Sequence, residues 1–545
     1  MKQFTITVVD TTGKQNYIFN SNRLRENIGA SFLLSQATKE LVEDILENNL
    51  GIPKSRQKQP IETSGLDAEI IYANGGNALI LFKSRKIAVE FTRILSKKVL
   101  AEASGINLLV AHADFDWEND KLYEIMEDLK KNEIEHQKYE RIHSAPLLTL
   151  GVTATCNSTQ LPAVDRSDKY INYDDDEALD SYLISTETRQ KLIAIKRANV
   201  KLQQIFSEVV DESIYEFPNR TDNLGRSKDE SSYVAVVHID GNGMGDRFKK
   251  CGEGKENRDY LNVMREFSKS VDSAGIKTLK AVAETLIKNI ESGRVEGKID
   301  GFNLKQDSKN NKVYLPFRPL VYGGDDITFI CEGRLGLELA ALCLQKFQEQ
   351  KVTDGKPLTA CAGVCIVKTH YPFSRAYKMS EDLCQSAKEF VKTERQKHRV
   401  DYFSAIDWHF AASGLLGSIS EIRRREYEVP KNNQSWHLEM RPLWLESQDE
   451  WRTWPGFTQV ISEFKQGDEW RERQNKIMAL RDVLRKGSSE AIAQFLLTYK
   501  LPNLPLYPTS SGENEKLIKE GWVNAMCGYF DAIEAMDFYL GIGSN

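Results

Sequence analysis

The chain has 545 residues, of which 41% are hydrophobic and 28% are charged, and its formal net charge at pH 7 is −6. This composition is typical of a globular protein of three or four domains, and it excludes a protein that attracts nucleic acid through overall positive charge. No stretch is apolar enough to span a membrane, and the eight cysteines show no disulfide or CxxC pattern. The N-terminus is not a signal peptide, so we expect a cytoplasmic protein.

The first 115 residues have the pattern of a β-α-β-β-α-β unit. The expected elements are a strand at 4–9, a helix at about 24–48, a hairpin at 69–82, a helix at 85–98 and a strand at 107–111. Gly75 and Gly76 form the hairpin tip, where they either leave room for a ligand or satisfy a tight turn that needs positive φ. Gly29 and Ser31 are candidate donors to a triphosphate.

Residues 116–225 mix helical patterns with polar loops and are expected to form a helical connecting domain. The acidic run 174–177 and the segment 226–232 are expected to be exposed connections.

Residues 226–400 repeat the order of elements seen in the first unit. The expected elements are a strand at 233–240, a helix at about 260–290, a hairpin at 318–331, a helix at 335–350, a strand at 358–367 and a helix at 374–392. Both hairpins carry Gly-Gly before an apolar strand, which indicates an internal duplication. We therefore predict an α+β fold with two tandem ferredoxin-like palm domains of the nucleotidyl cyclase type.

The tip of the second hairpin is acidic. Asp325 and Asp326 directly follow Gly323 and Gly324. Adjacent carboxylates repel each other and are most readily kept together by a divalent cation, and Mg²⁺ prefers a site made of one or two carboxylates plus substrate phosphates. The alternative is a solvated turn that happens to use Gly and Asp.

A second acidic position favours the metal site. Asp240 ends the strand 233–240 and leads into Gly241, Asn242 and Gly243. The glycines are expected to expose backbone N–H groups to phosphate oxygens. A dinucleotide-binding fingerprint fits poorly, because the spacing is not G-x-G-x-x-G. Asp240, together with the two hairpin aspartates, predicts a two-metal nucleotidyl transfer site.

The first unit lacks this chemistry. Asn77 and Ala78 occupy the positions of the aspartate pair, and Asp10 is the remaining carboxylate. We expect the first palm to be a degenerate partner that holds no metal in the same way but still binds a nucleotide at its glycine hairpin.

Residues 401–545 are expected to form a mainly helical C-terminal domain without chemistry of its own. Helical patterns lie at about 457–466, 471–498 and 514–540, and a short strand is expected at 425–429. The tryptophans of this region are expected in the core; they are Trp451, Trp454, Trp470 and Trp522.

With two palms, the second carrying Tyr-Gly-Gly-Asp-Asp, the chain resembles the large, palm-containing subunit of type III CRISPR effector complexes. Further matches lie at residues 23–31, 372–388, 424–427 and 441–443. The resemblance implies that the second palm joins ATP into cyclic oligoadenylates with Mg²⁺ or Mn²⁺ when target RNA binds, in an antiviral complex with guide RNA and other subunits. The resemblance gives Lys388 a role in binding triphosphate. The alternative, without the resemblance, is that Lys388 is an exposed helix lysine.

Three departures from the family pattern stand out. Because the pattern of the first palm begins at the first residues, we expect the N-terminal HD nuclease domain of the family to be missing. The zinc-binding cysteines between the palms are reduced to Cys156, and Asn242 replaces an aspartate, so that it could ligate a cation only through its carbonyl oxygen.

In the expected reaction the ribose hydroxyl of one ATP attacks the α-phosphate of another and pyrophosphate leaves, with Asp240 and Asp325 holding two cations. Two alternatives remain open, namely a stand-alone palm-domain cyclase of a related defence system and an inactive RNA-binding scaffold. The three intact aspartates argue against the scaffold.

Overall fold

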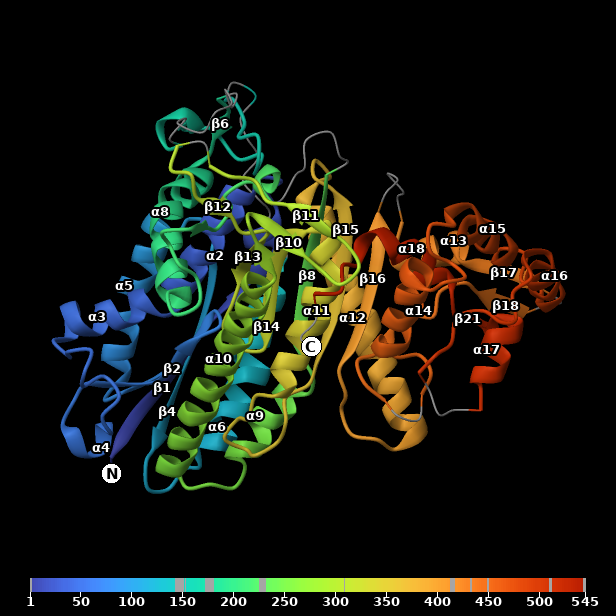
Figure 1. Cartoon of the computed structure of the whole chain (residues 1–545). Helices are drawn as coiled ribbons and strands as arrows, with labels where there is room; N and C mark the ends of the chain where they lie inside the picture. Colours follow the sequence, from blue (N-terminus) through green and yellow to red (C-terminus); the bar gives the residue numbers. More distant parts are fainter. Residues whose placement is uncertain are drawn as a thin grey trace.

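The structure is a computed structural model that describes residues 2–142, 151, 153–171, 181–224, 232–307, 309–411, 417–431, 434–447, 450–508 and 512–542. The first unit lies at one end of the molecule, the helical C-terminal region at the other, and the second unit between them (Figure 1). The acidic run 174–177 and residues 226–231 lie outside the described residues. None of the described helices is both long and apolar enough to cross a bilayer.

The first unit is a four-stranded antiparallel sheet in the order β2-β3-β1-β4. This is the strand order of a ferredoxin-like fold. Its elements are β1 (Gln3–Thr12), α1 (Lys14–Phe19), α2 (Leu24–Thr38), α3 (Glu40–Leu50), α4 (Ile61–Ser64), β2 (Ala68–Asn74), β3 (Asn77–Phe82), α5 (Arg85–Glu102) and β4 (Asn107–Asp116).

The helix expected at 24–48 is two helices. The chain leaves helical geometry at Lys39, where φ is −124° and ψ is −76°. No Gly or Pro causes this break. Tertiary packing does, because α2 packs against α8 (Thr186–Phe206) whereas α3 packs against α5.

The second unit repeats the same strand order and extends it. Its six-stranded sheet has the order β13-β14-β8-β15-β16-β19. The elements are β8 (Tyr233–Gly241), α9 (Met244–Gly252), α10 (Asn257–Lys288), β9 (Ile290–Glu291), β10 (Arg294–Glu296), β11 (Gly301–Asn303), β12 (Val313–Tyr314), β13 (Phe317–Val321), β14 (Asp326–Glu332), η4 (Gly333–Leu335), α11 (Gly336–Gln348), β15 (Ala360–Lys368), α12 (Phe373–His398), β16 (Ala405–Ala411) and β19 (Leu443–Trp444). These two sheets confirm the predicted fold class.

Two details of the second unit differ from expectation. The glycine-rich stretch is only partly a loop, because α9 begins at Met244 and includes Gly245. The sheet also continues beyond residue 400, since β16 pairs in parallel with β15. The division of the chain at 115, 225 and 400 stays a prediction.

The two units share one hydrophobic core. A single buried cluster contains Val9 and Ala78 of the first sheet together with Val236, Ile330 and Tyr377 of the second unit. Burying apolar surface stabilises a protein by roughly 25 cal/mol per Å². The apolar surface buried between the units therefore fixes how the two sheets face each other.

An ion-pair cluster adds a second link between the units. The carboxylate of Glu69 on β2 is fully buried and accepts hydrogen bonds from Arg258 (2.7 Å) and Arg265 (2.5 Å) of α10. Because α10 belongs to the second unit, this cluster joins it to the first sheet.

Helices and short strands connect the units. They are α6 (Leu122–Asp128), a π-helical turn η1 (Leu129–Ile134), α7 (Glu135–Ile142), β5 (Asp165–Arg166), η2 (Ser167–Lys169), β6 (Leu183–Ile184), α8, β7 (Tyr215–Glu216) and η3 (Thr221–Asn223). Cys156 is buried, and its sulfur lies 3.4 Å from the hydroxyl of Thr188. All eight cysteines are free, as expected.

The C-terminal region is mainly helical, with shorter helices than the patterns indicated. Its elements are α13 (Ile419–Glu426), β17 (Glu428–Lys431), β18 (Gln434–His437), α14 (Trp454–Gln466), α15 (Gln474–Leu484), α16 (Ser489–Tyr499), α17 (Asn514–Glu520), β20 (Trp522–Val523), β21 (Met526–Cys527), α18 (Phe530–Ala535) and η5 (Met536–Phe538). The four tryptophans expected in the core are all buried. The strand expected at 425–429 begins only at Glu428, because the preceding helix continues to Glu426.

Buried charges hold this region together. The side chains of Arg441 and Asp531 are completely buried, and their charged atoms lie 3.1 Å apart. The Arg441 guanidinium also lies 4.7 Å from the ring of Tyr427, whose hydroxyl donates to Glu534 at 2.9 Å. The segments 424–427 and 441–443, noted in the sequence as family matches, thus meet in one charged cluster.

We predict that Arg441→Met destabilises the C-terminal region by about 3–5 kcal/mol, because it leaves the buried Asp531 carboxylate without a counter-charge. Urea unfolding followed by tryptophan fluorescence measures this. Lys519→Met, which removes an exposed pair with Glu515, is the matched control and should change stability by less than about 1 kcal/mol. Equal effects of the two replacements would contradict the prediction.

Candidate active site

The acidic site is created by the pairing of β8 with β14. These strands are antiparallel, and Asp326 lies directly opposite Asp240. Residues directly opposite in an antiparallel pair project from the same face, with Cβ atoms about 4.5–5.5 Å apart. The two carboxylates predicted from separate parts of the sequence therefore face the same space.

Asp325 completes the group from the hairpin turn. Its backbone oxygen accepts the N–H of Gly241 at 3.1 Å. A Cβ atom on Gly241 would lie only 2.7 Å from the Cβ of Asp325, so a glycine is required at this contact. Gly323 and Gly324 have φ of 123° and 82°, which only glycine adopts readily.

Electrostatics make this group unstable without a cation. Burial, together with the charges of Asp240 and Asp326, raises the pKa of Asp325 to about 6, although Lys388 opposes the shift. Burial also raises the pKa of Asp326, although His238 opposes the shift. Carboxylates with raised pKa values in one cleft are typical of functional sites.

One carboxylate oxygen lacks a partner. Oδ1 of Asp326 is buried and accepts no hydrogen bond from a described residue. The imidazole of His238 lies beside it, with Nδ1 3.6 Å from this oxygen and 3.1 Å from the hydroxyl of Thr328. An orphaned carboxylate oxygen beside two more carboxylates fits the oxygen-ligand preference of Mg²⁺ or Mn²⁺.

Lys388 lies within the site. Its Nζ is 2.5 Å from Oδ2 of Asp240 and 3.4 Å from the carbonyl oxygen of Gly241. Burial lowers the pKa of Lys388, but the charge of Asp240 more than offsets this effect, so the net shift is upward. Lys388 is therefore neither an exposed helix lysine nor free for a phosphate; its ammonium occupies a place beside Asp240 that suits a cation.

The structure turns Asn242 away from the carboxylates. Its amide nitrogen donates to the carbonyl oxygen of Phe403 at 2.9 Å, and its Oδ1 accepts from the thiol of Cys361 at 3.4 Å. The backbone N–H groups of Gly241 and Asn242 donate to Asp325 and Thr359, so they are not exposed as expected. The first N–H groups of α9 have no intrahelical acceptor and remain available for phosphate oxygens.

The first palm has lost the whole carboxylate group. In its sheet Ala78 lies opposite Val9, so Val9, Asn77 and Ala78 stand where the second palm has Asp240, Asp325 and Asp326. Asp10 is one residue further along and projects from the opposite face of the sheet, which corrects our view of it as the surviving equivalent of Asp240.

Two lysines neutralise Asp10 in its different position. Its carboxylate lies 2.8 Å from Lys138 and 3.5 Å from Lys14. Burial opposes ionisation of Asp10, but these two ammonium groups outweigh it and lower its pKa.

A pocket of ≈ 150 Å³ lies between the two hairpins. Gly75 and Gly76 line it from the first palm, and Gly323 and Asp326 line it from the second. Phe19 and Tyr377 stack with ring centroids 3.8 Å apart at its wall. The pocket thus brings the two glycine tips together, as the duplication suggested.

Gly29 and Ser31, which we predicted to donate hydrogen bonds to a triphosphate, have other roles. A Cβ on Gly29 would lie 1.8 Å from the carbonyl oxygen of Lys191, so Gly29 allows α2 to cross α8 closely. Ser31 lines the pocket, but its hydroxyl donates to the carbonyl oxygen of Leu320. Gly75 and Gly76 have φ of 60° and 80°, so the turn alone is sufficient to explain both glycines.

Sequence reasoning missed four residues of this region. His238 and Tyr377 pack beside Asp326, and Lys14 and Asp272 line the pocket. His238 could have been found, because it lies two residues before Asp240 and so shares its face of the strand. The others come from separate helices and carry no local signal.

Two ferredoxin-like units, with two carboxylates at one hairpin and a third on the adjacent strand, define a protein with tandem palm domains of the nucleotidyl cyclase type. The sequence profile of the family described as Cas10/Cmr2, second palm domain, matches residues 233–399. The chain therefore carries a palm of the Cas10/Cmr2 family, which confirms its resemblance to the large subunit of type III CRISPR effector complexes. No curated protein matches its sequence.

Solved structures show the same fold. Csm1 of T. onnurineus has 14% identity and a TM-score of 0.52, covering 100% of this chain and 70% of that one. A Csm1–Csm4 cassette in complex with pppApA has 13% identity and a TM-score of 0.49, covering 98% and 69%. The cassette in complex with cA4 has 14% identity and a TM-score of 0.40, covering 71% and 53%. The chain thus spans between about half and 70% of the length of these proteins.

We predict a pH signature for Asp325. Its pKa of about 6 exceeds the ordinary 3.8, so between about pH 4 and 6 the native state binds more protons at this group than the unfolded state does, and metal-free stability falls as pH rises. The wild-type protein should therefore lose stability relative to Asp325→Asn as pH rises from 4 to 7, measured by urea unfolding in EDTA.

Asp10→Asn is the matched control for this prediction. The pKa of Asp10 is lowered below its ordinary 3.8, so the wild-type protein should gain stability relative to this variant as pH rises to about 5, and should show no further relative change up to pH 7. If the stability of the wild-type protein relative to each of the two variants changed with pH in the same direction, our description of the Asp325 environment would be wrong.

Proposed function

We propose that the chain is a metal-dependent nucleotidyltransferase that joins ATP into cyclic oligoadenylates, as the signalling subunit of a type III CRISPR RNA-guided antiviral complex. The observation that carries this proposal is the group of three carboxylates, one with a buried and unpartnered oxygen, beside a pocket between two glycine hairpins. Similar Csm1–Csm4 cassettes form complexes with cA4 and pppApA.

Asp240, Asp325 and Asp326 would hold Mg²⁺ or Mn²⁺. When bound, the cations would lower the pKa of the attacking ribose hydroxyl and neutralise the departing pyrophosphate. The chain itself orients the two nucleotides and supplies charge, as expected for phosphoryl transfer. Protons would compete with a cation for Asp325 and Asp326, because the pKa of each carboxyl is raised.

Lys388 has two positions in this scheme. Without a cation its ammonium balances the charge of Asp240 at 2.5 Å. If Asp240 held a cation, Lys388 would be repelled from it, and its flexible four-carbon side chain would allow it to move towards the triphosphate. The triphosphate-binding role given to Lys388 by family resemblance thus requires release from Asp240.

The pocket between the hairpins is suited to one base rather than a whole nucleotide. Its ≈ 150 Å³ lies below the 300–1,000 Å³ of typical ligand pockets. Apolar side chains such as Phe19, Phe32 and Ile276 line it, and Asp326 lies at its border. A base enclosed there would leave its phosphates beside the carboxylates, with the first palm forming half of the enclosure.

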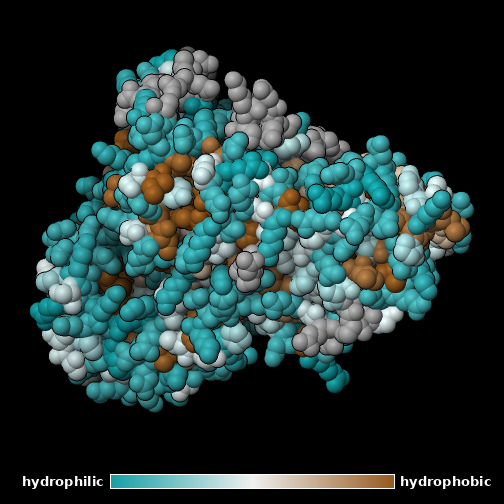
Figure 2. Space-filling model, viewed as in Figure 1, coloured by the Kyte–Doolittle hydropathy of each residue, from teal (hydrophilic) through white to brown (hydrophobic). Residues whose placement is uncertain are grey.

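Exposed apolar residues support the proposal that this chain binds partner subunits. On α8, Ile193 and Val200 are 55% and 46% exposed, and Leu497 on α16 is 74% exposed. Brown patches over the region of α8 and at the far end of the C-terminal helices interrupt an otherwise hydrophilic face in Figure 2. Apolar surface of this kind suits protein contacts. A relative, Csm1, is described in a cassette with Csm4.

Two other functions remain as alternatives. A stand-alone cyclase would have the same site, and gel filtration with and without guide RNA distinguishes it from a complex subunit. An inactive RNA-binding scaffold would keep three repelling carboxylates and an orphaned buried oxygen without use, at a cost of roughly 1–3 kcal/mol for the unpaired oxygen alone.

The decisive experiment offers each of the four nucleoside triphosphates with Mn²⁺ and identifies products by mass spectrometry. We expect cyclic oligoadenylates from ATP. Asp325→Ala/Asp326→Ala should lower the rate by at least about a hundredfold, as loss of a main electrostatic stabiliser does, while the metal-free protein melts at the same or a slightly higher temperature. Product formation near the wild-type rate would refute the assignment.

We also expect each chain to bind two nucleotides at the paired hairpins. Gly76→Val should reduce the stoichiometry of a non-hydrolysable ATP analogue from about two to about one, measured by calorimetry with metal present. Gly65→Val is the control for backbone strain, because Gly65 has a similar φ of 70° but lies away from the pocket. One nucleotide per unaltered chain would refute the shared site.

A further inference from the structure

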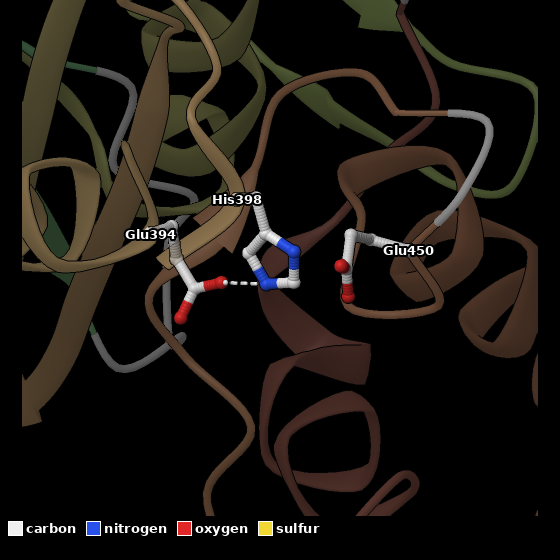
Figure 3. A group of neighbouring side chains, drawn as sticks. All are labelled: Glu394, His398 and Glu450. Carbon is white, nitrogen blue, oxygen red and sulfur yellow. Dashed lines mark ion pairs between the residues drawn. The ribbon is translucent and has the colours of Figure 1, made fainter. Parts of the chain in front are cut away.

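A second group of metal-ligating side chains lies away from the three aspartates. Glu394 and His398 are one turn apart near the end of α12, and Glu450 approaches them from the segment that precedes α14. Figure 3 shows the imidazole between the two carboxylates. One ligand atom from each residue lies within 4.8 Å of the other two.

We propose that these three residues bind a divalent transition-metal ion of the Zn²⁺ class, which ties the end of α12 to the C-terminal region. An ion with ligand distances of about 2.0–2.2 Å holds its ligand atoms about 3–4 Å apart. The carboxylate of Glu394 and Nε2 of His398 are already separated by 3.2 Å. Small side-chain rotations therefore complete the site, with water as a fourth ligand.

The donor set selects the class of ion. Imidazole favours zinc and related transition metals, whereas Mg²⁺ favours sites made only of oxygen. Two carboxylates and one imidazole also give the site a charge of −2 when the imidazole is neutral, which a divalent cation balances. The three aspartates beside Lys388, with no imidazole held as a ligand, suit a different ion.

Glu450 lacks a counter-charge in contact with it. Its side chain makes no hydrogen bond or ion pair with any described residue. The charged groups that face it are Glu394, His398, Lys397 and Glu513, with Arg452 nearby. The Arg452 guanidinium is already used, since it donates to the carbonyl oxygens of Met440 and Pro442. Burial raises the pKa of Glu450, as expected for a partly desolvated carboxylate among other acids.

The position of the site gives the metal a structural consequence. Helix α12 carries Lys388, which contacts Asp240, and six residues later it carries Glu394. A metal at Glu394, His398 and Glu450 would therefore hold the helix behind the candidate active site against the segment after β19. The simpler alternative is that protonated His398 pairs with both glutamates and no metal binds.

The test measures Zn²⁺ binding by calorimetry in a full-length Asp325→Asn/Asp326→Asn chain, so that the proposed catalytic site does not contribute and its failure cannot affect the result. We expect one Zn²⁺ fewer per chain after His398→Ala, and binding at least about tenfold weaker after Glu450→Gln, the loss that even an outer-shell partner produces. Mg²⁺ should not compete. Zn²⁺ should raise the melting temperature only where His398 is present.

His136→Ala is the matched control. His136 and Glu140 form an exposed pair one turn apart, with 3.3 Å between their charged atoms, but no third ligand joins them among the described residues. This variant should bind as much Zn²⁺ as the background chain. The proposal is overturned if the background chain binds no Zn²⁺ saturably, or if His398→Ala and His136→Ala change the stoichiometry equally.

Discussion

The register between β8 and β14 is the constraint on which the site depends. Placing Asp240 opposite Asp326 brings two like charges to one face, and the turn adds Asp325. Such an arrangement is unfavourable by itself. The chain tolerates it because both strands are buried in the middle of a sheet whose packing supplies the free energy, and because Lys388 compensates part of the charge. A shift of one residue would send one carboxylate to the other face.

The second constraint is that the palms share their core. Val9 and Ala78 pack in the cluster that contains Val236 and Tyr377, and Ser31 bonds to the backbone of β13. These contacts hold two glycine hairpins face to face. Duplication alone would not achieve this, because two independent copies joined by a linker could adopt many relative positions. The shared core fixes the relative position of the two similar units, and a defined pocket therefore forms between their hairpins.

Local patterns revealed much of this arrangement. The Gly-Gly hairpins, the apolar strands and Asp240 at a strand end are readable because each signal lies within a few residues. The loss of the first-palm site was foreseen, but the place of Asp10 was not, since a one-residue offset in pairing depends on the partner strand. The side-chain bonds of Asn242, the break at Lys39 and the positions of Lys14 and Asp272 likewise depend on residues distant in sequence.

The contact between Lys388 and Asp240 allows the second palm to fold without a bound metal ion. A site of three bare carboxylates would make the native state depend on cation concentration, as in proteins that are unfolded without their metal. Here the counter-ion belongs to the same chain, so it is always present at a high effective concentration. The palm can therefore fold in a metal-poor environment, and under the proposed function a cation would have to compete with the ammonium to enter. A nucleotide that arrived with its own cation, and offered phosphates to the displaced lysine, would meet that competition better than a free ion.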